Sequence, residues 1–279
     1  MNKQTNKQIK GKPLAYPDAI GLRYYRAIAP MINAMERETQ ARLAELFEKP
    51  STAKVLATMD AKQQTIAERA ATIIATMRKK YMRIFERDMG GIVKNMLKGI
   101  DNASRVGVAT SLKGMGEGLT VSADFLTGPM KEEFAALTQA NVSLFKTIPE
   151  VYFPKVEAAV MDSITKGEGL KDLKPFFESH SNGTKNYAQL RAMDQTRKAY
   201  TSVNIARMKK LGVTRLEWLH SHGSNDPRKL HQELSGKVFP IDEPPVIYTE
   251  KGIDVHGWGG EAINCRCTCS PVFDFEEVD

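Results

Sequence analysis

Side chains that can hold a metal ion or move protons gather near the end of this 279-residue chain. Four of its five histidines and all three cysteines fall within residues 220–269. They are His220, His222, His231, His256, Cys265, Cys267 and Cys269. Imidazole and thiolate are natural zinc ligands, and a bound zinc stabilises a small module by tying its loops together. We therefore predict a zinc site with His231, Cys265 and Cys267 as its first ligands.

The fourth ligand of this site can be His220, His222, His256 or Cys269, and sequence separation does not rank them. The candidate ligand set that we adopt is His231, Cys265, Cys267 and His256. Cys265 and Cys267 form a CxC pair, and the sequence has no CxxC pair. The side chains of a CxC pair point to the same side only on a regular strand. A competing interpretation is that the cysteines are small buried residues and the histidines form hydrogen bonds to local turns.

A catalytic interpretation can use the same cluster. Asp226, Glu233 and Asp254 can supply a base for a metal-activated water in a hydrolase or nuclease. The sequence contains no HExxH, GxSxG or paired-acid motif to support this interpretation, and no phosphate-binding glycine loop. We therefore predict no enzymatic activity and interpret the isolated His180 as a loop residue.

The segments around the cluster have a pattern that is typical of short strands and turns. Apolar or aromatic runs at 216–219, 237–241, 246–248 and 269–275 are separated by segments rich in Gly, Pro, Asp and Ser. This pattern predicts a small β-rich module over residues 213–279. Its acidic end, residues 273–279, is typical of a frayed terminus.

The sequence ahead of this module is dominated by helical spacing of apolar residues. We predict a basic flexible arm at 1–17, a basic helical region at 18–112, a Gly-rich linker at 113–129 and a second helical region at 130–212. Apolar residues from Val55 to Ile100 predict one long helix or two in series, with Gly90 and Gly91 as the natural break. The second region predicts helices at 129–145, 151–165 and 184–211. The fold class is therefore α+β.

Charge is unevenly distributed along the chain, whose net charge is +7. Residues 1–113 carry 21 Lys and Arg against 10 Asp and Glu, whereas the remainder is slightly acidic. The long helix carries six candidate cations for nucleic acid: Lys79, Lys80, Arg83, Arg87, Lys94 and Lys98. Such a face can contact DNA phosphates or simply be solvated. No apolar stretch is long enough to span a membrane, no secretory signal is evident, and the clustered cysteines exclude a disulfide framework.

The order of motifs in the last 70 residues resembles the phage Mu F-like head morphogenesis family of tailed phages. The motifs that carry the resemblance are Trp218, DPRKLHQELSGKVFPIDEPP at 226–245 and EAINCRC at 261–267. The resemblance covers residues 213–272 well and about 140–212 loosely. Family members carry a CxxC or an RxxH element before an LxG turn, followed by an NCRC element. Here Arg228 and His231 form the RxxH version, Gly236 ends the turn, and Asn264 and Arg266 belong to NCRC. With no CxxC pair, the resemblance to zinc-ribbon-like members is weaker.

This resemblance implies a non-enzymatic minor head protein in the phage head interior, near the portal. The implied partners are the portal protein, the major capsid or scaffolding protein, and double-stranded DNA bound without sequence preference, but no membrane. The implied role is head morphogenesis, with help in DNA packaging or ejection. The protein would be present in the host cytoplasm during assembly and in the virion afterwards.

Overall fold

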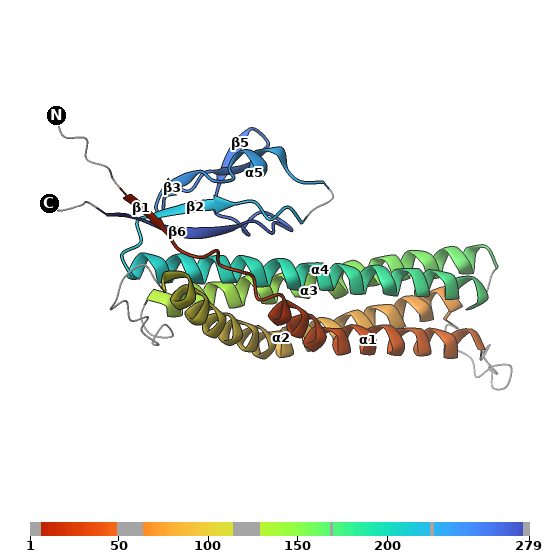
Figure 1. Ribbon diagram of the computed structural model, residues 1–279. Coiled ribbons are helices and arrows are strands. Elements are labelled where there is room, and N and C mark those ends of the chain that lie inside the picture. The colour runs from red at the N-terminus through yellow and green to blue at the C-terminus, as the bar shows by residue number, and fades with distance from the viewer. Residues whose placement is uncertain (1–6, 49–63, 114–128, 168–169, 224–225, 276–279) are drawn as a thin grey trace, which may run out of the picture. The chain divides into compact units, whose positions relative to one another are not determined.

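The fold is α+β, as the sequence predicts, with long helices followed by a small region of antiparallel strands. The computed structural model describes residues 7–48, 64–113, 129–167, 170–223 and 226–275 (Figure 1). Its long helices are α1 (Asp18–Glu48), α2 (Ile66–Leu112), α3 (Pro129–Thr165) and α4 (Leu170–Lys210). The predicted linker lies outside the described residues except at its two ends, as do Val55 and Met59.

The long helices continue through residues that the sequence suggests as breaks. α2 passes through Gly90 and Gly91 as one helix, and α3 joins the two helices predicted at 129–145 and 151–165. α4 begins at Leu170 rather than 184, so His180 is helical and its interpretation as a loop residue is wrong. α3 contains Pro149 and Pro154 in its interior. An interior proline destabilises a helix by about 3 kcal/mol, whereas burying one large apolar side chain stabilises the fold by about 1.5–3 kcal/mol. α3 buries Phe145, Ile148, Tyr152, Phe153, Val156 and Val160.

A capping box starts α2. The Thr65 hydroxyl accepts a hydrogen bond from the Glu68 backbone N–H at 3.1 Å, and the Glu68 carboxylate accepts one from the Thr65 N–H at 2.8 Å. This reciprocal pair satisfies donors that a helix start leaves free. The start of α2 is therefore specified by two residues in local sequence.

The chain divides into two compact units, each containing parts of all four long helices. Unit 1 comprises residues 1–24, 94–137 and 191–279, and unit 2 comprises residues 25–93 and 138–190. Ile28, Ile32, Met35, Phe85 and Phe153 are among the fully buried residues of unit 2. Within the described residues, no helix is long and apolar enough to cross a membrane.

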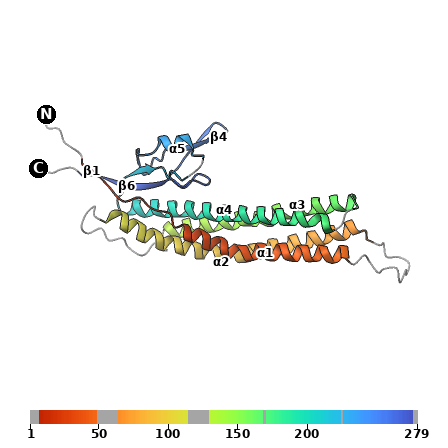
Figure 2. The same cartoon turned by 45° about the vertical axis from the view of Figure 1, so that its right-hand side comes forward.

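The β-rich module belongs to unit 1. Its main sheet has the order β1-β6-β2-β3, formed by β1 (Lys7–Lys10), β6 (Thr268–Phe275), β2 (Arg215–Leu219) and β3 (Val238–Pro240). A separate hairpin pairs β4 (Val246–Glu250) with β5 (Ile253–His256), and the short α5 (Lys229–Glu233) lies beside β4 (Figure 2). Each of the four predicted runs contains a strand, whereas β5 and α5 were not predicted.

Part of the predicted flexible arm is an ordered strand. β1 pairs antiparallel with β6, with Ile9 opposite Phe273, and the Gly11 N–H donates to the Pro271 carbonyl at 2.9 Å. Leu14 then lies buried, with only 3% of its surface exposed. The prediction is wrong for residues 7–17 because β6 offers a sheet edge whose backbone groups need partners. Residues 1–6 lie outside the described residues.

Candidate metal centre and cation surface

Three of the predicted metal ligands meet in the interior of the β-rich module. Nδ1 of His231 lies 3.5 Å from Sγ of Cys265 and 3.7 Å from Sγ of Cys267. These three donor atoms all lie within 4.8 Å of one another, and all three residues are buried. Side chains 34 and 36 residues apart in sequence therefore share one centre.

His231 is held by α5 and by the strands beside it. Its Nε2 lies 2.9 Å from the Ile247 carbonyl, an acceptor that requires Nε2 to carry a proton. Trp218, fully buried on β2, packs edge-to-face on the imidazole at a ring-centroid distance of 5.1 Å. After α5 the chain turns at Gly236, which has φ of 80° and donates its N–H to the Trp218 carbonyl at 2.8 Å. These contacts aim Nδ1 at the two sulfur atoms.

The sulfur atoms of the CxC pair have different electrostatic surroundings. The pKa of Cys265 is lowered because its sulfur accepts hydrogen bonds from the Cys267 thiol and from His231, and also from the backbone N–H groups of Gly260 and Cys267. The contact with Cys265 in turn raises the pKa of Cys267. It also raises the pKa of His231, since a thiolate neighbour favours the imidazolium. The centre therefore favours an anionic sulfur at Cys265.

The other predicted motif residues shape the loops that carry these ligands. Asn264 adopts a left-handed conformation with φ of 56°, and its N–H donates to the buried Asp194 carboxylate at 2.6 Å. Arg228 donates to the Ile263 carbonyl at 2.8 Å, and Arg266 donates to the Gly223 carbonyl at 3.3 Å. The RxxH and NCRC elements thus position backbone around the centre.

The N-terminal segment contributes a further anchor, which was not predicted from the sequence. The Tyr16 hydroxyl lies 2.7 Å from the Gly259 carbonyl and 2.6 Å from the Cys267 carbonyl, and Thr201 also donates to Gly259 at 2.8 Å. Gly260 has φ of 96°, and a Cβ at this position would clash with the Tyr16 hydroxyl. No local sequence signal identifies Tyr16 or Asp194, because their partners are far away in the sequence.

The remaining fourth-ligand candidates lie elsewhere. His256 is exposed, and its Nδ1 contacts the Pro244 carbonyl at 2.9 Å, so the structure does not bring it to the centre. His220 and His222 contact each other through their Nδ1 atoms at 3.4 Å. Burial raises the pKa of Cys269 to about 12, and its backbone carbonyl accepts from Leu14. Among the described residues, the centre gathers three donors, and Asp226, Glu233 and Asp254 do not join it.

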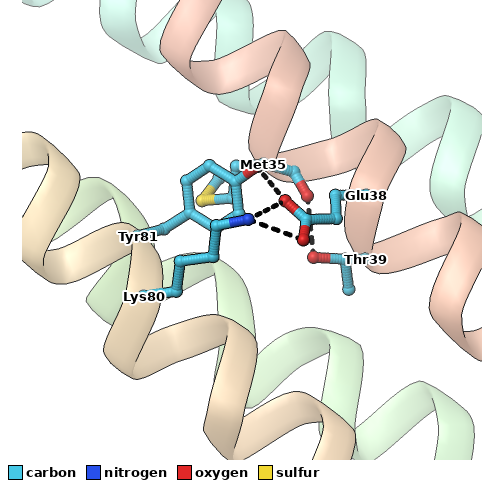
Figure 3. A network of polar contacts seen from close by, with 5 residues as sticks. All are labelled: Met35, Glu38, Thr39, Lys80 and Tyr81. Carbon is cyan, nitrogen blue, oxygen red and sulfur yellow. Dashed lines mark hydrogen bonds and ion pairs between the residues drawn. The ribbon is translucent and has the colours of Figure 1, made fainter.

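All six predicted nucleic-acid cations are exposed on α2, but two of them have acidic partners. Lys80 contacts both carboxylate oxygens of Glu38, at 2.7 and 2.6 Å, and the Tyr81 hydroxyl donates to the same carboxylate at 2.7 Å (Figure 3). The pKa of Glu38 is lowered by these bonds, chiefly the one from Lys80. Arg87 pairs with Asp88 at 2.6 Å. Lys80 therefore links α2 to α1, whereas Arg87 pairs with its neighbour within α2.

The other four cations form no ion pair with the described residues. Lys79 and Arg83 belong to unit 2, and Lys94 and Lys98 belong to unit 1. Arg105, which was not among the predicted cations, follows Lys98 by seven residues and is also exposed. Among the described residues, its partner is the neutral side chain of Asn102, to which it donates at 2.7 Å. Spacings of four and seven place Lys94, Lys98 and Arg105 along one face of α2.

Comparison with known proteins agrees with the motif. Residues 154–270 match the family model described as phage Mu protein F like protein, which confirms the resemblance predicted from the sequence. This region includes Trp218, Arg228, His231, Gly236, Asn264 and both cysteines of the CxC pair. The convergence of the RxxH and NCRC elements therefore lies within the part of the chain that resembles this family.

Two curated proteins are also similar to this chain. An uncharacterized protein of Haemophilus influenzae is 29% identical over 208 residues, which cover 71% of this chain and 44% of that protein. The NAD(+)–arginine ADP-ribosyltransferase EFV of Enterococcus faecalis is 34% identical over 83 residues, which cover 29% of this chain and 17% of that protein. The matches span less than half of either relative. No solved structure is significantly similar to the chain.

Proposed function

We propose that this protein is a structural head-morphogenesis protein of a tailed phage and has no catalytic role. The observation that carries the proposal is the meeting of His231, Cys265 and Cys267 in one buried centre, within the region that matches the phage Mu F-like model. The motif residues around them position backbone, and Cys265 and Cys267 are buried, each with 3% of its surface exposed. This burial favours a structural centre over the hydrolase or nuclease alternative.

The donor set of the centre fits a zinc ion. Zinc lies about 2.3 Å from sulfur and about 2.0–2.1 Å from nitrogen in tetrahedral sites, which places neighbouring donors about 3.5 Å apart. The two Nδ1 to Sγ distances of 3.5 and 3.7 Å match this spacing. The Nε2 contact to Ile247 is the orienting bond that metal-bound histidines usually make. His231, Cys265 and Cys267 would hold the ion, which would cross-link α5 to the CxC loop.

The proposed DNA contact uses Lys94, Lys98 and Arg105. These side chains are exposed on one face of α2 and have no acidic partner among the described residues. Contacts to phosphates need only positive charge and carry no sequence information, which suits a protein beside packaged DNA. The proposed protein partners are the portal and the major capsid or scaffolding protein, and the proposed location is the head interior near the portal after assembly in the host cytoplasm.

The head-morphogenesis role is tested by deleting the gene from the phage or prophage that encodes it. We expect infectious particles to fall by at least tenfold, and mass spectrometry of purified wild-type heads to detect the chain. Complementation with a Cys269→Ser variant, whose thiol lies outside the centre, should restore particles, whereas a His231→Ala variant should restore few. Normal particle yield after deletion, together with heads that lack the chain, would refute the proposal.

A further inference from the structure

A groove between α2 and α3 is unrelated to the metal centre. It lies entirely within unit 2 and has a volume of about 440 Å³. Its floor is apolar: Ala71 and Ala75 leave room for a close approach of another backbone, and Met82 is a half-buried side chain that adapts its shape. An apolar floor of this kind gains free energy only when an apolar side chain covers it.

The rim of the same groove is positively charged. Arg78, Lys79 and Arg83 are exposed along it and form no ion pair with the described residues. The opposite wall adds Lys146, which pairs with Glu86 at 2.8 Å, and the single further acid Glu157. The cations on the rim therefore outnumber the acids, and three of them are available to an incoming anionic group.

The apolar floor and the positively charged rim of the groove favour one kind of anionic partner over another. The phosphate backbone of DNA would engage the cations but would leave the apolar floor uncovered. A helix with one apolar stripe flanked by carboxylates would use both, in the manner of amphipathic helices that lie in hydrophobic grooves. The combination of charge and floor therefore favours a protein helix.

We propose that the α2–α3 groove binds an acidic amphipathic helix of a partner protein. The apolar stripe of that helix covers Ala71, Ala75 and Met82, while its carboxylates pair with Arg78, Lys79 and Arg83. The inference does not depend on the head-morphogenesis role, because it uses only the residues of unit 2. The α2 cations with a proposed partner then fall into two sets. Arg78, Lys79 and Arg83 belong to the groove, whereas Lys94, Lys98 and Arg105 belong to the proposed DNA contact.

The test measures binding of a fluorescein-labelled helical peptide of about 18 residues by fluorescence anisotropy. The peptide carries Leu at i, i+4, i+7 and i+11, with Glu beside this stripe. We expect saturable binding to the full chain and at least a tenfold loss of affinity in the variant Arg78→Gln, Lys79→Gln, Arg83→Gln. The matched control is Lys80→Gln, Arg87→Gln, Lys166→Gln, which removes equal charge from cations paired with Glu38, Asp88 and Asp162.

The floor is tested separately from the charge. An Ala75→Glu variant should bind the peptide at least tenfold more weakly, and a peptide of the same composition with its Leu and Glu order scrambled should bind weakly to the wild type. Far-ultraviolet circular dichroism verifies that each variant is helical. Absence of saturable binding, equal binding of the scrambled peptide, or equal losses in the two triple variants would overturn the proposal. The proposal would also be overturned if a DNA duplex displaced the peptide through contacts with Arg78, Lys79 and Arg83.

Discussion

His231 connects most of the features that define the candidate centre. The proton on Nε2 is directed at the Ile247 carbonyl, which leaves Nδ1 to face the two sulfur atoms. The same arrangement is compatible with a thiolate–imidazolium contact and with metal binding, because in both cases Nδ1 must lie on the side of the ring that faces the sulfur atoms.

The first prediction concerns metal content. Purified protein should contain about one zinc per chain, and Cys265→Ser or His231→Ala should lose it, because each removes one of only three gathered donors. Cys269→Ser is the matched control and should retain the metal. Elemental analysis by mass spectrometry measures the ratio. A metal-free wild type whose thermal stability is unaffected by chelators would contradict the zinc proposal.

The second prediction concerns the anchor at Tyr16. Tyr16→Phe removes a hydroxyl that donates to a backbone carbonyl of Gly259 or Cys267, so the free energy of unfolding should fall by about 1 kcal/mol. Chemical denaturation monitored by tryptophan fluorescence measures the change. Tyr25→Phe removes a half-buried hydroxyl that forms no hydrogen bond with the described residues, so its effect should be smaller. Equal effects of both substitutions would argue against the anchor.

The third prediction concerns pH and His180. Burial lowers the pKa of His180, which stacks on Tyr152 at 5.0 Å and on Phe176 at 5.2 Å, and Lys155 lowers it further. Because the unfolded chain then binds more protons below about pH 6.5, the stability of unit 2 should fall as pH decreases through this range. His180→Gln should reduce this loss. Parallel stability curves for wild type and variant would refute the assignment.

At the scale of single elements, α2 shows how burial outweighs local preference. Its two adjacent glycines disfavour a helix, yet Phe85, Met89 and Val93 on either side are all fully buried. A helical glycine costs roughly 1 kcal/mol relative to alanine, which is less than the gain from burying one of these side chains. The glycines therefore weaken the helix without breaking it.

The fourth prediction follows from this cost. A Cβ added at Gly90 or Gly91 would meet no heavy atom within 4 Å, so Gly91→Ala should stabilise the protein by about 0.5–1 kcal/mol. Gly107 lies in the same helix, but a Cβ there would be 2.6 Å from the Tyr200 hydroxyl. Gly107→Ala should therefore destabilise the protein. Thermal unfolding of both variants measures the contrast, and the same sign of change in both would contradict this account.

At the scale of the whole molecule, ion pairing decides which positive charges are available. The net charge of +7 includes cations that are already paired within the protein, such as Lys80 and Arg87. A paired cation has less electrostatic free energy to gain from a phosphate, because its carboxylate partner must be displaced. Composition therefore overstates the number of side chains that can bind DNA.

The fifth prediction concerns DNA affinity. The intact protein should bind duplex DNA without sequence preference, and the affinity should fall steeply between roughly 50 and 200 mM salt. Replacing Lys94, Lys98 and Arg105 by Gln should reduce the slope of log affinity against log salt by about 2–3, since each phosphate contact contributes about 0.9. The triple variant at Lys80, Arg87 and Lys166 controls for total charge. Equal slopes in the two variants would exclude this face of α2.

Local patterns in the amino-acid sequence are sufficient to predict the fold class, the positions of the helical and strand regions, and the motif that carries the family resemblance. Helical spacing, short apolar runs and the RxxH and NCRC elements are local patterns, so they can be recognised without knowing which distant residues meet. Their limits appear at element ends and at α5, where five residues carry too little periodicity to be recognised.

Contacts between distant segments were needed to establish that His231 meets Cys265 and Cys267 while His256 does not. The same is true of the support that Tyr16 and Asp194 give to the loops around the centre, and of the ion pair that Lys80 forms and Lys94 does not form with the described residues. Each of these outcomes has the same origin. Hydrogen bonds and ion pairs form over a few ångströms between side chains whose separation in sequence does not determine their separation in space.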